Sequence, residues 1–175
     1  MRARISMLAL LGCVWLGRSF AFTAEYQVKA AFVYNFAKFI EWPNPATLKA
    51  VTICVYGKDP FGGFLDEAVR GKEVHGLPIV LRRLPAGDDG WAGCQVLFVG
   101  LSKTAQVETL LVQMKGRSIL TVGESAGFAN SGGMIGLTVD GGRVRFDINL
   151  TSVAAAHLKA SAQIIEIGRV VRSPN

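Results

Sequence analysis

The chain is poor in the residue types from which metal and nucleotide sites are usually built. It has only two histidines, His75 and His157, and neither has a cysteine or carboxylate at the spacing of a zinc site. The sequence also contains no phosphate-loop motif and no dinucleotide-binding glycine motif. We therefore expect no metal, nucleotide or other cofactor.

Long apolar runs are scarce too, and the longest one lies at the N-terminus. Residues 1–21 are typical of an export signal, because Arg2 and Arg4 precede an apolar core and small residues lie around Ala21. The apolar core is too short to span a bilayer as a permanent helix. We expect this signal peptide to be cleaved near Ala21.

A lipid anchor is the alternative interpretation of the N-terminal segment. Residues 10–13 resemble the motif that directs lipid attachment to a cysteine, which here would be Cys13. The residues after Cys13 are apolar, whereas the tether of a lipoprotein is normally polar. This difference favours a cleaved signal peptide.

Blocks of like charge are absent from the rest of the chain. Cleavage near Ala21 removes three arginines and no acidic residue, so the net charge falls from +6 to +3. Without a basic cluster, the sequence gives no support for nucleic-acid binding. Residues 22–175 have the length of one domain, and no repeat or linker divides them.

Cys54 and Cys94 are the only cysteines outside the leader. An even pair in an exported domain favours a disulfide. Two buried free thiols remain the alternative, because a bridge requires Cα atoms within about 7 Å and sequence alone gives no distance.

Apolar segments of strand and helix type alternate along the chain. Their lengths and periodicity predict strands at residues 51–56, 77–84, 95–100, 118–122, 134–139 and 143–148, and helices at 25–41, 59–70, 102–115 and 150–167. Asp140-Gly141-Gly142 predicts a hairpin between the last two strands, and Asn149 is placed to cap the last helix. The expected fold is a single layered α/β domain with a mixed sheet flanked by helices, ending in a β-hairpin followed by a helix.

The first helix is apolar over more than half of its circumference. Helical spacing places one group of residues on an apolar face and a second group opposite: Val28, Phe32, Asn35, Phe36 and Phe39, against Gln27, Tyr34, Lys38 and Glu41. Most of the aromatic side chains should lie in the core. The remainder are candidates for a second interface, because large exposed apolar patches usually mark partner sites.

The segment 123–127 fits the G-x-S-x-G pattern of a hydrolase nucleophile. Ser125 follows a predicted strand, and acidic residues and His157 follow it in the order of a catalytic triad. However, the next segment is glycine-rich where a nucleophile elbow needs a helix, and His157 falls on the apolar stripe of the last predicted helix. We interpret Ser125 as a loop residue and the protein as non-enzymatic, with an esterase as the less favoured alternative.

Three longer segments carry a more specific pattern than G-x-S-x-G. Residues 25–43, 120–137 and 143–171 resemble, in this order, the YfiR family, and together they span most of the chain after the leader. In that family the position of Ser125 varies within the glycine-rich segment, which implies a structural loop.

The resemblance implies a periplasmic regulatory protein of Gram-negative bacteria. The best-known member represses an inner-membrane diguanylate cyclase by binding its periplasmic sensor domain, and a peptidoglycan-binding outer-membrane lipoprotein sequesters that repressor. We therefore expect an inhibitor of cyclic-di-GMP signalling and biofilm formation, with these two proteins as partners and a homodimer as its assembly. The alternative is a periplasmic small-ligand-binding module that feeds a membrane sensor such as a histidine kinase.

The resemblance also bears on particular residues. The type member has two disulfides, and Cys54 and Cys94 are placed like one of its pairs, whereas this chain lacks the other. The expected partner-binding residues come from the first helix and the glycine-rich loop: Tyr34, Lys38, Glu41, Trp42, Phe128 and Met134.

Overall fold

The computed structural model describes residues 16–101 and 103–172, with side chains from Thr23 onward. Most of the expected signal peptide, including Cys13, lies outside these residues, as does Ser102. Among the described helices, none is both long enough and apolar enough to span a bilayer.

The centre of the domain is an eight-stranded mixed sheet with the order β10-β8-β7-β6-β5-β2-β4-β3. The strands are β2 (Val51–Gly57), β3 (Glu73–Val74), β4 (Leu77–Leu84), β5 (Val96–Gly100), β6 (Leu120–Gly123), β7 (Ile135–Asp140), β8 (Arg143–Asn149) and β10 (Arg169–Val171). Neighbouring strands from β4 to β7 run parallel, β7 and β8 are antiparallel, and β10 runs parallel to β8. The predicted mixed sheet is confirmed.

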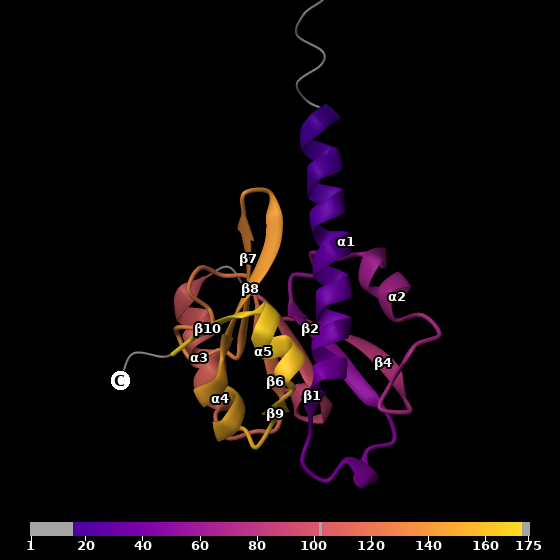
Figure 1. The fold of residues 1–175 in the computed structure, drawn as a ribbon, viewed down its shortest axis with the longest axis vertical. Helices are drawn as coiled ribbons and strands as arrows, with labels where there is room; N and C mark the ends of the chain where they lie inside the picture. Colours follow the sequence, from indigo (N-terminus) through magenta and orange to yellow (C-terminus); the bar gives the residue numbers. More distant parts are fainter. Residues whose placement is uncertain (1–15, 102, 173–175) are drawn as a thin grey trace, which may run out of the picture.

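Helices cover both faces of this sheet (Figure 1). On one face, α1 (Leu16–Phe39), α2 (Gly63–Val69) and α5 (Ala162–Ile167) share one apolar core with the alternate residues Val51, Ile53 and Val55 of β2. On the other face, α3 (Thr104–Met114) packs against Cys54 and Tyr56 of the same strand. Burial on both faces explains why the central strands are continuous apolar runs.

Three predicted features agree closely with the structure. The predicted strand at residues 77–84 is β4, and α3 buries Val107, Leu110, Leu111 and Met114 at helical spacing. In the hairpin, Asp140 pairs with Arg143, and Gly141 and Gly142 take positive φ values of 54° and 73°. Positive φ at both central residues defines the tight turn that matches the twist of the two strands.

The first two helices differ from the prediction in their limits and orientation. α1 ends at Phe39, and the next two residues form β1 (Ile40–Glu41). Its buried face is centred on Ala30, Val33 and Phe36, while Val28 is 45% exposed. The small side chain of Ala30 lets the helix approach the sheet closely on that side. α2 begins at Gly63, after an irregular loop and a turn.

The last predicted helix is two helices. Asn149 caps α4 (Leu150–Ala155) as expected, accepting a hydrogen bond of 3.0 Å from the Ser152 amide. His157 then adopts a left-handed φ of 58°, which ends the helical path. This turn lets β9 (Lys159–Ala160) pair antiparallel with β1 before α5 begins. His157 is consequently exposed, and its predicted place on an apolar stripe is wrong.

Candidate functional site

The glycine-rich loop connects β6 to β7 and is a packed corner of the fold. The Phe128 ring lies between Gly123 and Gly133, and a Cβ atom at either glycine would overlap the ring. Phe128 is only 2% exposed. Two of the glycines are therefore explained by the close approach of an aromatic ring to the backbone.

Three hydrogen bonds fasten this loop to the sheet. The Met134 amide donates to Thr121 Oγ1 at 3.1 Å, and the Asn149 side chain donates to the Ala129 carbonyl at 2.8 Å. The Asn149 amide also donates to the Met134 carbonyl at 2.8 Å. Because Asn149 also caps α4, one buried side chain fixes both the loop and the start of the helix.

Ser125 lies in a turn within this loop. The residues that follow it form further turns and lead into β7. A nucleophile elbow instead requires the serine to lie between a strand and a helix. The local geometry thus supplies no elbow for Ser125.

Next to Ser125, Glu124 connects the loop to α1. The Lys29 ammonium group donates to Glu124 at 2.6 Å, and the Tyr26 hydroxyl donates to the same carboxylate at 3.2 Å. Lys29 is 4% exposed and also pairs with Glu25 at 2.5 Å. The spacing of Glu25 and Lys29 is readable as a helical ion pair. No local sequence pattern predicts the third partner, Glu124, because it comes from a distant segment of the chain.

This cluster shifts the pKa of its basic member. Burial of the ammonium group lowers the pKa of Lys29, but hydrogen bonds to Glu124 and Glu25 outweigh this effect, and the pKa is raised. Burial, followed by the charge of Glu124, raises the pKa of Tyr26. Lys29 is therefore charged at neutral pH, and its ion pair with Glu124 connects α1 to the loop.

The six predicted partner-binding residues do not form one surface. Lys38 and Glu41 are exposed and Tyr34 is half-buried, whereas Trp42, Phe128 and Met134 are at most 7% exposed. The Trp42 indole nitrogen donates to the Gln95 carbonyl at 3.3 Å, so this ring is an internal contact. Only the first three residues are available to a partner.

Tyr34 is the centre of this remaining surface. The Lys72 and Lys38 ammonium groups lie 4.5 and 5.7 Å from the centre of its ring. Its hydroxyl donates to the Glu73 carbonyl at 3.4 Å. An aromatic ring between two cations, held at the surface, is suited to contact acidic or apolar groups of another protein.

A groove of about 670 Å³ lies beyond the end of α1. Its walls include Trp42, Leu48 and Leu77, and its polar residues include His75 and His157. The two histidines, distant in sequence, thus line the same groove. Among the described residues, no three histidine, cysteine, aspartate or glutamate side chains are placed to hold a metal ion.

The backbone around the groove is unusual. In the described part of the chain, the non-glycine residues with positive φ are Asn44, His75 and His157, with values of 52° to 58°, and all three line the groove. Such conformations cost energy in residues with a side chain and often occur at functional sites.

Cys54 and Cys94 form a disulfide, which confirms the preferred interpretation of the sequence. Their Cα atoms are 5.9 Å apart, and both residues are at most 2% exposed. The bridge connects β2 to the residue that follows the short 3₁₀ helix η2 (Gly90–Gly93).

A second 3₁₀ helix, η1 (Pro45–Thr47), lies beside the groove.

A family model described as YfiR/HmsC-like matches residues 26–169. The chain belongs to the YfiR/HmsC-like family. The matched range of this YfiR/HmsC-like protein contains the disulfide, the glycine-rich loop and the groove. The resemblance inferred from three sequence segments is therefore confirmed.

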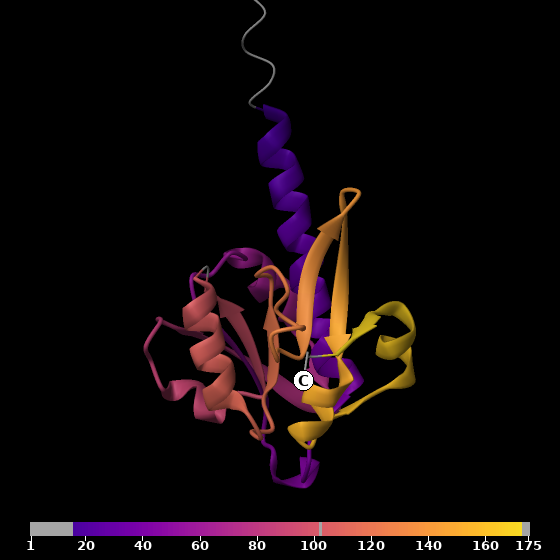
Figure 2. The ribbon, with the colours of Figure 1, turned by 90° about the vertical axis from the view of Figure 1, so that its left-hand side faces the viewer.

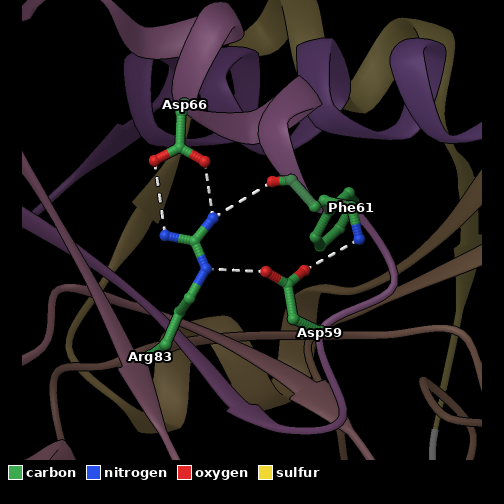
Figure 3. A network of polar contacts seen from close by, with 5 residues as sticks. Asp59, Phe61, Asp66 and Arg83 are labelled. Atoms are coloured by element: carbon green, nitrogen blue, oxygen red, sulfur yellow. Dashed lines mark hydrogen bonds and ion pairs between the residues drawn. The ribbon is translucent and has the colours of Figure 1, made fainter.

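A polar network holds α2 of this YfiR/HmsC-like protein against β4 (Figure 3). Arg83 donates to Asp59 at 2.7 Å, to Asp66 at 2.6 Å and to the Gly62 carbonyl at 3.1 Å. Asp59 also accepts a hydrogen bond of 2.8 Å from the Phe61 amide. Asp59 therefore shapes the loop before α2 and does not begin the helix, which corrects the prediction.

Replacing Arg83 with glutamine should lower the free energy of unfolding by about 1 kcal/mol at pH 7. Hydrogen bonds from Arg83 hold the pKa of Asp66 below its usual value. A carboxylate whose pKa is lowered by folding stabilises the fold at pH values above its pKa in the unfolded chain. This stabilisation is lost as the pH falls through its pKa in the folded protein. The difference between parent and Arg83→Gln should thus shrink from pH 7 to pH 3.

Urea unfolding at both pH values measures this effect. Arg145→Gln is a suitable control, because Arg145 is exposed and has no ion pair among the described residues. A loss of the same size at pH 7 and pH 3 would show that Arg83 does not act through the ionised carboxylate.

Proposed function

We propose that this protein is a periplasmic, non-enzymatic inhibitor of an inner-membrane diguanylate cyclase. The observation that carries the proposal is the YfiR/HmsC-like family match over residues 26–169. The export signal expected from residues 1–21 and the Cys54–Cys94 disulfide support a periplasmic location, because disulfides persist in oxidising compartments. By inhibiting the cyclase, the protein would lower cyclic-di-GMP levels and biofilm formation.

The inhibition requires binding without chemistry. A protein that binds one conformation of the cyclase's periplasmic sensor domain better than another shifts the population toward the preferred conformation. The packed form of the glycine-rich loop supports this view, since the segment around Ser125 leads from a strand into turns. A peptidoglycan-binding outer-membrane lipoprotein is the proposed second partner, and a homodimer is the proposed assembly.

The surface around Tyr34 is the proposed contact for the sensor domain. Its ring between Lys38 and Lys72 combines an aromatic group with positive charge, and tyrosine is enriched among residues that dominate binding energy. Glu41 lies near the same end of α1 and is exposed. Loss of one such dominant contact costs about 2 kcal/mol, or roughly 30-fold in affinity.

Deleting the gene should raise cellular cyclic-di-GMP and biofilm, and the parent gene should restore both. A variant with Tyr34→Ala and Lys38→Glu should restore them poorly, because it binds the sensor domain roughly 30-fold more weakly. Lys115→Glu is the matched control, since Lys115 is exposed beyond α3 on the opposite face. Unchanged cyclic-di-GMP after deletion, in a strain carrying the cognate cyclase, would contradict the proposal.

The groove favours a second candidate function, a small-ligand-binding module that feeds a membrane sensor. Its apolar walls, with His75, His157 and Lys159 at the edge, have the character of a small-molecule site. A thermal-shift screen of periplasmic metabolites separates the two functions, because the ligand-binding function requires stabilisation by one of them and the inhibitor function does not.

A further inference from the structure

The β7–β8 hairpin projects beyond the rest of the sheet, on the side toward which the start of α1 also points (Figures 1 and 2). β7 pairs with β8 from Arg143 to Ile148, but β10 pairs only with residues 147–149 on the other side. In the described part of the chain, residues 143–146 therefore have no strand partner on that side. They form a free arm of the sheet.

The two faces of this free arm differ in character. Val144 and its cross-strand partner Val139 are on the same face as Phe146, which packs against Phe32 of α1 with ring centres 5.6 Å apart. Val139 is 49% exposed. Val28, four residues before Phe32 on α1, is 45% exposed. The apolar core therefore continues outward between α1 and the hairpin, and among the described residues none covers these exposed valines.

The opposite face of the free arm carries Arg143 and Arg145, with Asp140 of β7 directly across from Arg143, so its net charge is positive. Arg143 and Arg145 are both exposed, and neither has an ion pair among the described residues. By contrast, Arg169 on β10 pairs with Asp147 through two hydrogen bonds of 2.7 Å. Charged residues on an edge help to prevent unwanted pairing. That role accounts for the arginines, but it does not account for the exposed valines.

A second copy of this chain is a poor occupant of the free arm. In an antiparallel pair about a twofold axis, directly opposite residues share a face. If the axis passes through residue 144, Arg143 of each copy lies opposite Arg145 of the other. If it passes through residue 145, the two Arg145 side chains lie opposite each other. Like charges placed opposite one another destabilise a strand pair.

We propose that residues 143–146 accept an extended segment of a partner protein in which apolar and acidic residues alternate. The segment adds to the sheet as a strand beside β8, with backbone hydrogen bonds supplying affinity. Its apolar side chains pack beside Val144, on the face of the sheet that also carries Val139, and its carboxylates pair with Arg143 and Arg145. The mode of attachment is independent of whether the partner is a cyclase.

The test uses a short synthetic peptide that alternates valine and glutamate, and a matched peptide that alternates valine and lysine. Fluorescence anisotropy of the labelled peptides should show that the protein binds the glutamate peptide and not the lysine peptide. Amide hydrogen exchange should slow at residues 143–146 when the glutamate peptide is bound. This slowing reports strand addition and not merely charge attraction.

Two pairs of variants locate the contact. Arg145→Glu should weaken binding of the glutamate peptide by about ten-fold, whereas Lys103→Glu, an exposed charge change before α3, should not. Val144→Asp should weaken binding, whereas Val112→Asp should not, because Val144 lies on β8 at the proposed contact and Val112 is 73% exposed on α3. Arg145, Lys103 and Val112 are exposed, so melting temperatures close to that of the parent are expected for their variants. Val144 is half-buried, and the melting temperature of Val144→Asp shows whether that variant is folded.

Several results would overturn the proposal. Equal binding of the two peptides would show that the arginines do not select acidic residues, and slowed exchange elsewhere would place the peptide on another element. Absence of glutamate-peptide binding would also reject it. A homodimer that dissociates on Val144→Asp in sedimentation experiments would identify a second copy as the occupant.

Discussion

Replacing both Cys54 and Cys94 with alanine is expected to lower the free energy of unfolding by about 4 kcal/mol. The two cysteines are 40 residues apart in sequence, so the bridge closes a long loop and restricts the unfolded chain. Both are buried in the α3 side of the core. Urea unfolding of the oxidised parent and the double variant at 25 °C measures the loss.

The parent unfolded in the presence of a reductant provides the control for this prediction. Reduction should lower the stability of the parent toward that of the double variant and leave the variant unchanged. If parent and variant melt identically in oxidising buffer, the bridge does not stabilise the fold, contrary to the expectation.

Phe128→Ala should cost about 3–5 kcal/mol, the range found when a buried phenylalanine is truncated. The ring fills the space between Gly123 and Gly133, and neither glycine has a side chain that could move into the vacated volume. The glycine-rich loop would lose its main core contact while keeping its hydrogen bonds to Thr121 and Asn149. Urea unfolding again measures the change.

A double-mutant cycle tests whether the contact between the Phe128 ring and the neighbouring glycine causes this loss of stability. Gly123→Ala alone should cost about 1–3 kcal/mol, because the added methyl group overlaps the ring. With Phe128→Ala already present, the same change should cost much less, since the methyl group then occupies the void. Strictly additive losses would show that the two positions do not share this space.

Local patterns predicted the elements whose signals lie within a few residues. The two glycines after Asp140 defined the hairpin, and the helical spacing from Val107 to Met114 defined α3. Asn149 was identified as a cap because its side chain acts on an amide only three residues away. The disulfide pairing was also favoured correctly, because only two cysteines lie outside the expected signal peptide.

Features that depend on distant contacts could not be predicted. The last helix divides at His157 because β9 pairs with β1, more than a hundred residues earlier in the chain. The sequence suggested Phe128 and Met134 as surface residues because it could not show that the glycine-rich loop folds inward around them. The groove escaped prediction for a similar reason, since His75 and His157 meet only in the folded chain.

The left-handed backbone at Asn44, His75 and His157 has a consequence for the stability of this protein. Glycine adopts that conformation without steric cost, whereas a residue with a side chain is disfavoured there by about 1 kcal/mol or more. The chain therefore carries an amide and two imidazoles at three positions where the backbone favours glycine, and the contact of 3.0 Å between His75 Nε2 and the Ile40 carbonyl offsets part of that cost. Residues held in such conformations cluster at functional sites, which makes the edge of this groove the first place to substitute side chains one at a time.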